Sequence, residues 1–227
     1  MTDGPRSIGI ILDGNRRFAK ERGLPTFEGH RAGYEKVKEV ARWAKDAGIE
    51  ELTVYAFSTE NWKRSQEEVG YLMKLLEGAF DDWLKDVERE GTRIRFIGQR
   101  DRLAPSLTAR IEEVEERTKD ASGFTLVVAL SYGGRQEILD AVNTLLARTD
   151  LDQVTEEELR GAMWSVGLAD PDLIIRTSGE KRLSNFLTWQ GVYSELFFVD
   201  SYWPAFSKEE FDRVLDEYRT RERRLGK

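Results

Sequence analysis

An acid, a glycine, an amide and two arginines stand together at residues 13–17, directly after the apolar run at residues 8–12. An unbroken apolar run is typical of a buried parallel strand, and ligands bind just beyond the carboxyl ends of such strands. Helix-start N–H groups and guanidinium groups hold diphosphates, while Mg²⁺ prefers a carboxylate together with phosphate oxygens. The candidate metal ligand is therefore Asp13, and the candidate phosphate ligands are Gly14, Asn15, Arg16 and Arg17.

Two other interpretations of residues 13–17 are open from the sequence. Asp-Gly is a common hairpin turn, but a hairpin needs a second apolar strand, and residues 16–22 are charged and helix-forming. Asp13 could also cap the helix that follows, which is compatible with ligand binding. We favour a strand-to-helix ligand site over the hairpin.

Polar side chains also follow other apolar runs. The run at residues 52–57 ends in a polar cluster at residues 58–64, and the run at residues 173–175 ends in Arg176. Arg176, Arg182 and Ser184 predict a second anion-binding loop, because a solvated loop is an odd place for an arginine directly after buried strand residues. His30 is the only histidine in the chain, which excludes a multi-histidine metal site; by itself it indicates no role.

The composition excludes several classes of protein. Without cysteine, the chain can hold no disulfide, zinc–thiolate site or iron–sulfur cluster, which suits a reducing compartment. The start of the chain lacks a signal pattern, and no apolar run approaches the roughly 20 residues that span a bilayer, so we expect a cytoplasmic protein. A net charge of −7 argues against general nucleic-acid binding, although clustered arginines predict a small cationic pocket for a phosphorylated molecule.

Apolar periodicity predicts strands that alternate with helices, and hence one α/β domain over residues 1–227 with a mostly parallel sheet flanked by helices. We expect strands at residues 8–12, 52–57, 94–98, 124–130, 173–176 and 195–199, and helices at residues 34–44, 67–90, 105–120, 136–147, 155–166 and 208–224. The apolar stripe of residues 67–90 is wide enough to line a cavity as well as a core. Polar residues follow Leu12, Phe57, Leu130 and Arg176, and parallel strands place all four ends on one edge of the sheet. One composite site is therefore the simplest interpretation.

Five motifs are spread along the chain. They are Asp13-Gly14-Asn15-x-Arg17, Gly29-His30-x-x-Gly33, a motif at residues 55–64, Tyr132-Gly133-Gly134-Arg135, and a motif from Ile175 through Trp189-Gln190 to Leu196. The Tyr-Gly-Gly-Arg motif lacks the three-glycine spacing of a dinucleotide-binding fingerprint. Together, and over nearly the whole chain, these motifs resemble the cis-prenyltransferases of the undecaprenyl diphosphate synthase type.

The resemblance implies a homodimer with a six-stranded parallel sheet and a hydrophobic tunnel. It implies a Mg²⁺-dependent enzyme that condenses isopentenyl diphosphate with an allylic diphosphate, gives a Z-polyprenyl diphosphate and releases pyrophosphate. Contact with a membrane would arise only through the lipid product. The resemblance assigns metal binding to Asp13 and Glu195, the latter across the dimer, and catalysis to Asp13 and Asn61. It assigns substrate binding to Gly14, Asn15, Arg16, Arg17, Phe18, His30, Ser58, Trp62, Arg64, Arg176, Arg182 and Ser184, and a tail over a neighbouring active site to Arg224-Leu225-Gly226.

The chain departs from the pattern of the long-chain members at several positions. Those positions are Ser7, Arg16, Phe18, Thr26 and Lys181. Arg16 offers a cation that could offset an arginine commonly found at the position of Thr26. A short-chain or irregular isoprenoid diphosphate synthase of the same fold is therefore an alternative. A non-catalytic partner subunit would be expected to lose motifs that this chain keeps, and a phosphohydrolase with Asp13 as nucleophile would need an acid where Asn15 stands.

Overall fold

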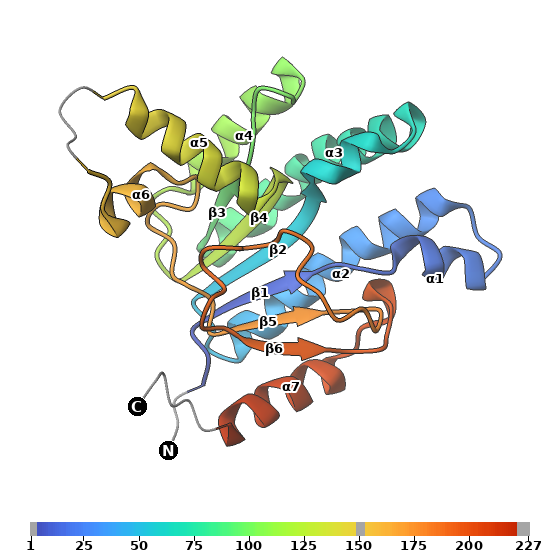
Figure 1. Ribbon diagram of the computed structural model, residues 1–227. Coiled ribbons are helices and arrows are strands. Elements are labelled where there is room, and N and C mark those ends of the chain that lie inside the picture. The colour runs from blue at the N-terminus through green and yellow to red at the C-terminus, as the bar shows by residue number, and fades with distance from the viewer. Residues whose placement is uncertain (1–3, 149–152, 222–227) are drawn as a thin grey trace.

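The central sheet has six strands, and every neighbouring pair is parallel. The computed structural model describes residues 4–148 and 153–221, with the backbone alone for residues 79 and 81–90. The strand order is β3-β4-β2-β1-β5-β6 (Figure 1). The strands are β1 (Ser7–Ile11), β2 (Glu51–Ser58), β3 (Thr92–Ile97), β4 (Phe124–Tyr132), β5 (Leu173–Arg176) and β6 (Glu195–Phe198). The predicted α/β class and the parallel sheet are confirmed.

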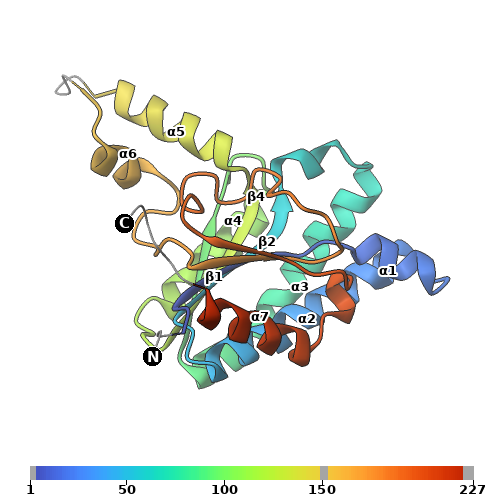
Figure 2. The same ribbon diagram turned by 60° about the horizontal axis from the view of Figure 1, so that its bottom comes forward.

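Helices cover both faces of the sheet. They are α1 (Asn15–Glu21), α2 (Thr26–Asp46), α3 (Gln66–Glu90), α4 (Pro105–Thr118), α5 (Gly134–Leu146), α6 (Glu156–Ala162) and α7 (Lys208–Thr220), with short 3-10 helices η1 (Thr59–Lys63) and η2 (Trp203–Ala205). Figure 2 shows α2, α3 and α7 on one face, and α5 and α6 on the other. No helix in the described part of the chain is long and apolar enough to cross a membrane.

Alternate residues of the strands supply two separate cores, because successive side chains of a strand point to opposite faces. Ile8 and Ile10 of β1 face the larger core, which also takes buried side chains from α2, α4 and α7. Ile11 faces the smaller core, where Phe186 and Leu187 of the loop after β5 cover the sheet. The unbroken apolar run of β1 thus reflects burial on both faces.

The first long helix begins at Thr26, eight residues before the predicted start at residue 34. Gly29 and Gly33, which disfavour a helix by propensity, lie where α2 contacts α1. A Cβ atom at Gly29 would lie 2.1 Å from the carbonyl oxygen of Asn15, and one at Gly33 would lie 2.3 Å from Asn15 Oδ1. Close helix contact therefore outweighs the propensity cost of the two glycines.

The other predicted bounds differ mainly at helix ends. Helix α6 ends at Ala162 instead of residue 166, since the backbone at Met163 is extended. Helix α7 ends at Thr220 and not at residue 224, since the backbone at Arg221 is extended. The predicted Arg224-Leu225-Gly226 tail lies within residues 222–227, outside the described residues. The remaining elements agree with the prediction within two residues at each end.

Candidate active site

A cavity of about 1100 Å³ lies at the carboxyl ends of the strands and continues between the sheet and helices α2 and α3. Its mouth is polar and includes residues that follow β1, β2 and β5. Its interior is lined by apolar side chains of Val37, Val54, Leu72, Leu75, Leu76 and Val128. The composite site predicted from four strand ends is therefore present at three of them, with an apolar extension behind it, while the residues that follow Leu130 in β4 do not line the cavity.

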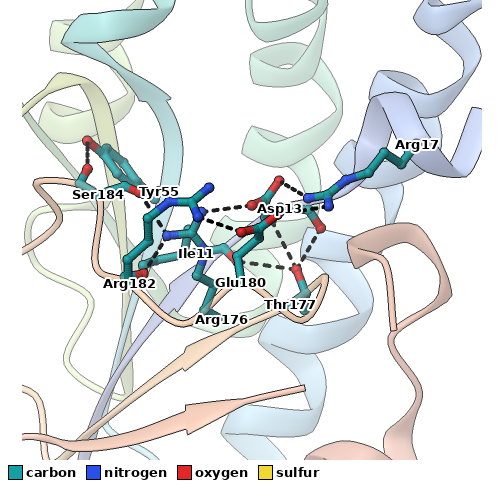
Figure 3. A network of polar contacts seen from close by, with 9 residues as sticks. All are labelled: Ile11, Asp13, Arg17, Tyr55, Arg176, Thr177, Glu180, Arg182 and Ser184. Carbon is teal, nitrogen blue, oxygen red and sulfur yellow. Dashed lines mark hydrogen bonds and ion pairs between the residues drawn. The ribbon is translucent and has the colours of Figure 1, made fainter. Parts of the chain in front are cut away.

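Asp13 lies at the mouth of the cavity and is held by the loop that follows β5 (Figure 3). Its backbone N–H donates to Thr177 Oγ1 at 3.0 Å, and the Thr177 hydroxyl donates to the Asp13 carbonyl oxygen at 2.7 Å. Its carboxylate accepts hydrogen bonds from Arg176 Nη2 at 2.8 Å and from Arg17 Nη2 at 3.2 Å. We call Asp13, Arg17, Arg176 and Thr177 the Asp13 cluster.

The carboxylate of Asp13 does not cap the following helix. The N-cap residue of α1 is Gly14, and no side-chain hydrogen bond caps that helix. Gly14 has φ of +107°, and a Cβ atom there would lie 2.8 Å from the ring of Tyr202. The capping interpretation of Asp13 is therefore wrong, and its carboxylate faces the two arginines at the cavity mouth.

Arg176 also organises the second anion-binding loop. Its Nη1 donates to the Ser184 hydroxyl at 2.8 Å and to the carbonyl oxygen of Arg182. Glu180 connects the segment after β1 with the second anion-binding loop. Its carboxylate accepts from Arg17 Nη1 at 3.1 Å and forms an ion pair with Arg182. The two guanidinium groups hold the pKa of the Glu180 carboxyl below its ordinary value.

A second charge cluster lies around Glu68 of α3. Glu68 Oε1 lies 3.1 Å from His30 Nε2 and accepts from Arg64 Nη1 at 2.9 Å, while Arg16 Nη1 lies 3.9 Å from Glu68 Oε2. Burial lowers the pKa of His30 below 6.5, although the hydrogen bond to Glu68 opposes this shift. His30 is therefore neutral at neutral pH. We call Arg16, His30, Arg64 and Glu68 the Glu68 cluster.

The register of β2 with β4 shifts between Tyr55 and Ser58, at the carboxyl end of β2. Ser58 N–H then donates to Asn61 Oδ1 at 3.0 Å, which fixes the start of η1. The indole N–H of Trp62 donates to Ser131 Oγ at 2.9 Å, and its ring packs against Phe57. The indole therefore faces the end of β4 and not the cavity.

Most of the predicted site residues line the cavity: Asp13, Gly14, Asn15, Arg16, Arg17, His30, Ser58, Asn61, Arg64, Arg176 and Ser184. Phe18, Trp62, Arg182 and Glu195 do not line it. The Phe18 ring lies under the guanidinium of Arg22, and Arg182 is exposed beside Glu180. Glu195 lies at the amino end of β6, whereas Asp13 follows the carboxyl end of β1. Glu195 accepts from Arg221 Nη1 at 2.7 Å.

Sequence reasoning gave no role to three residues that shape the site: Tyr55, Glu68 and Thr177. The Tyr55 hydroxyl lies within 3.3 Å of the carbonyl oxygens of Tyr132 and Ser184, so it braces the second anion-binding loop from the sheet. Thr177 directly follows a predicted buried strand, and Glu68 lies four residues after Arg64. Both positions could have marked these residues in the sequence as candidates for the site.

The donor chemistry of the mouth fits a cation that arrives with a phosphorylated ligand. Among the side chains that the structure describes, no group of three His, Asp or Glu residues could hold a metal ion. Mg²⁺ is commonly held by one or two carboxylates together with substrate phosphates and water. The Asp13 carboxylate at the cavity mouth matches this arrangement, since arginines that can hold the phosphates lie on both of its sides.

A comparison with known proteins then identifies the family. The family model described as "Putative undecaprenyl diphosphate synthase" matches residues 11–226. The chain belongs to this family. Two members of the undecaprenyl diphosphate synthase family illustrate the similarity. An isoprenyl transferase of Thermotoga maritima is 46% identical over 225 residues, which cover 98% of this chain and 97% of that protein. A tritrans,polycis-undecaprenyl-diphosphate synthase (geranylgeranyl-diphosphate specific) of Thermoplasma volcanium is 46% identical over 230 residues, with coverage of 98% and 89%.

Solved structures of similar proteins share the fold over the whole chain. Lavandulyl diphosphate synthase from Lavandula x intermedia, solved with dimethylallyl diphosphate, has a TM-score of 0.94 at 31% identity and covers 99% of both chains. The structure of a probable undecaprenyl diphosphate synthase from Campylobacter jejuni has a TM-score of 0.84 at 33% identity and covers 100% of both chains. The resemblance to the undecaprenyl diphosphate synthase family is therefore confirmed in sequence and in structure.

Proposed function

We propose that this prenyltransferase condenses isopentenyl diphosphate with an allylic diphosphate, gives a Z-polyprenyl diphosphate and releases pyrophosphate. The observation that carries this function is the cavity itself, whose cationic mouth leads into an apolar interior. Such a shape suits a substrate with a charged diphosphate head and a hydrocarbon tail. A site that held only a small phosphorylated molecule would not need the apolar interior.

Each diphosphate has its own set of ligands at the mouth. The allylic diphosphate lies on the N–H groups and side chains of residues 14–17, beside His30, where a helix start favours anions. Isopentenyl diphosphate lies on Arg176, Arg182 and Ser184. Phe18, Trp62 and Arg182, which do not line the cavity, would contact substrate only after side-chain movement.

The chemistry follows from where charge develops. As the allylic carbon–oxygen bond breaks, negative charge builds on the leaving pyrophosphate, and Arg17 stabilises it. The cationic carbon needs a dry apolar wall, which the interior of the cavity supplies. The alkene of isopentenyl diphosphate forms the new bond to that carbon and then loses a proton, which the released pyrophosphate can accept. Asn61, whose side chain accepts from the backbone N–H of Ser58, lines the cavity and would contact the reacting groups. Alignment of two bound substrates contributes about 7–11 kcal/mol of the barrier in well-oriented reactions, so no covalent nucleophile is required.

The proposed cofactor is Mg²⁺, with Asp13 as its ligand within this chain. When bound, the ion would neutralise charge on the pyrophosphate that leaves. The proposal is supported by the Asp13 carboxylate at the mouth, placed between two arginines that can hold phosphate oxygens.

A homodimer would bring Glu195 to the metal region of a second copy. The proposal is supported by the distance along the sheet between Asp13 and Glu195 within one chain, and by exposed apolar side chains on α5 (Leu139 and Leu146). Asp13→Ala and Glu195→Ala proteins should each be inactive, and refolding them as a mixture should restore activity, because one site of each hybrid has both acids. Absence of recovery would contradict the role of Glu195 across the dimer.

The proposed location is the cytoplasm, with membrane contact only through the lipid product and no nucleic-acid partner. The absence of cysteine and the net charge of −7 support this location and this choice of partners.

A panel of donors tests the function. The protein is incubated with Mg²⁺, isopentenyl diphosphate and dimethylallyl, geranyl, farnesyl or geranylgeranyl diphosphate, and the products are read by mass. Products longer than the donor by whole five-carbon units are expected. Failure with every donor would overturn the proposal. A single coupling of short substrates would favour the second candidate, a short-chain or irregular synthase, which the 0.94 TM-score to lavandulyl diphosphate synthase supports.

A further inference from the structure

Asn185 connects three segments that are far apart in the sequence. Its Nδ2 donates to Glu60 Oε1 at 3.1 Å and to Gln136 Oε1 at 3.0 Å. Its Oδ1 accepts from the backbone N–H of Arg135 at 2.8 Å, and its backbone carbonyl accepts from the N–H of Gly134 at 2.8 Å. Every polar group that Asn185 offers through its side chain is thus used in a contact outside its own loop.

The Tyr132-Gly133-Gly134-Arg135 motif makes room for this arrangement. A Cβ atom at Gly133 would lie 2.6 Å from Asn185 Nδ2 and 2.7 Å from the Thr59 hydroxyl oxygen. A Cβ atom at Gly134 would lie 2.3 Å from the Thr188 hydroxyl oxygen. The N-cap of α5, Gly133, has no side chain, and Asn185 satisfies the first N–H groups of that helix instead. The two glycines therefore allow three segments to meet.

Both loops joined by Asn185 carry side chains of the cavity mouth. Ser184, its neighbour, accepts from Arg176 Nη1 at 2.8 Å in the second anion-binding loop. Glu60 lies between Ser58 and Asn61 in the segment after β2, and all three line the cavity. Ser184 and Asn185 have φ of +49° and +68°, a backbone conformation that needs support from its surroundings. A change at Asn185 is therefore expected to reach both sides of the mouth.

We propose that Asn185 is a positioning residue that fixes the Arg182–Ser184 loop against the Ser58–Asn61 segment, so that the isopentenyl diphosphate pocket and the opposite side of the cavity mouth form one unit. The proposal rests on the proposed function, since it assigns isopentenyl diphosphate to the Arg182–Ser184 loop and places Asn61 of the other segment at the reacting groups. Asn185 does not need to touch either substrate for this role.

Asn185→Asp is the sharpest probe. It keeps the Oδ1 acceptor for Arg135 and tolerates positive φ, but it removes the donor to Glu60 and places two carboxylates face to face. Although burial opposes the shift, hydrogen bonds from its own backbone amide and from Asn185 lower the pKa of Glu60, so this carboxyl is charged at neutral pH. Titration calorimetry with isopentenyl diphosphate alone, and separately with geranyl S-thiolodiphosphate, should show both affinities weakened by about 10-fold. In steady state both KM values should rise while kcat stays within about 3-fold.

The matched variants separate positioning from a general loss of folding. Adding Glu60→Gln to Asn185→Asp supplies a new donor that faces the new carboxylate. The loss in log affinity that Asn185→Asp causes should therefore be at most half as large in the Glu60→Gln background as in the unmodified protein. Asn143→Asp makes the same chemical change at an exposed position of α5 and should leave both affinities unchanged. A weakening of only one affinity, a loss in kcat alone, or no recovery in the double variant would overturn the proposal. Condensation products from the unmodified protein test the proposed function separately, because the affinities are measured without turnover.

Discussion

The Asp13 cluster and the Glu68 cluster both contribute side chains to the mouth of the cavity, yet they are built from different elements. In the Asp13 cluster, the acid follows β1 and Arg176 ends β5, and these two strands are adjacent in the sheet. In the Glu68 cluster, the partners come from α1, α2, α3 and the segment after η1. The first cluster is therefore fixed by strand register and the second by helix packing.

Arg176 of the Asp13 cluster and Arg16 of the Glu68 cluster differ in how tightly they are held. The Arg176 side chain is 5% exposed and makes hydrogen bonds through both of its terminal nitrogens, whereas the Arg16 side chain is 63% exposed and lies 3.9 Å from Glu68. A rigid arginine suits the stabilisation of charge that develops during reaction, because it needs no reorganisation. An adjustable arginine suits the recognition of substrates.

Asp13→Asn should have the largest effect, with kcat/KM about 10²–10³-fold lower. The amide keeps the size of the side chain, but it removes the charge that faces Arg17 and Arg176. It also removes the proposed ligand of the metal ion. Initial rates of product formation measure the loss, with Asp120→Asn at an exposed position as the control. A loss below 10-fold would contradict a central role for the Asp13 cluster.

Thr177→Val should affect both stability and rate, because the methyl group cannot exchange hydrogen bonds with the backbone of Asp13. Loss of a buried hydroxyl partner is expected to lower the free energy of unfolding by about 1–3 kcal/mol, and kcat/KM by about 10-fold. Denaturant titration and initial rates measure the two effects. Thr177→Ser keeps the hydroxyl and should lie near the unmodified protein; equal behaviour of the two variants would show that the hydroxyl is not the cause.

Arg16→Gly should raise the KM for the allylic diphosphate by about 3–5-fold, as expected for an exposed cation at a phosphate. The KM for isopentenyl diphosphate should not change, since Arg16 belongs to the other half of the mouth. Arg16→Ala separates loss of the guanidinium from the cost of glycine in a helix. An unchanged allylic KM in both variants would remove Arg16 from substrate binding.

The smallest expected effect is the pH response of His30. Its lowered pKa means that the unfolded chain binds more protons than the folded one between the folded pKa and 6.5. The stability contributed by neutral His30 is therefore complete above pH 6.5 and falls as the pH drops toward the folded pKa. NMR titration of the only histidine should give a pKa below 6.5, and Glu68→Gln should lower it further. A pKa of 6.5 or higher would show that burial does not dominate.

The difference between the two clusters also explains what the sequence could predict. Unbroken apolar runs mark strands buried on both faces, and their parallel direction places Asp13, Ser58 and Arg176 on one edge without knowledge of the strand order. The Asp13 cluster follows directly from that rule. Local pattern contains no comparable rule for Glu68, because its contact with His30 depends on how α2 and α3 pack.

Trp62 shows a second limit of prediction. The resemblance assigns it to substrate binding, whereas its indole N–H donates to Ser131 and its side chain does not line the cavity. Thr26 shows a third limit, since the helix start there depends on close contact of Gly29 and Gly33 with α1. Both features arise from contacts between segments that sequence spacing does not relate.

The central claim is that one cavity joins two diphosphate substrates through carbon–carbon bond formation. The most direct test counts pyrophosphate released and five-carbon units added in the same reaction with isopentenyl diphosphate, an allylic diphosphate and Mg²⁺. We predict one pyrophosphate for each unit added, and neither product from Asp13→Asn within the same time. Release of pyrophosphate or orthophosphate without a longer product would contradict the claim.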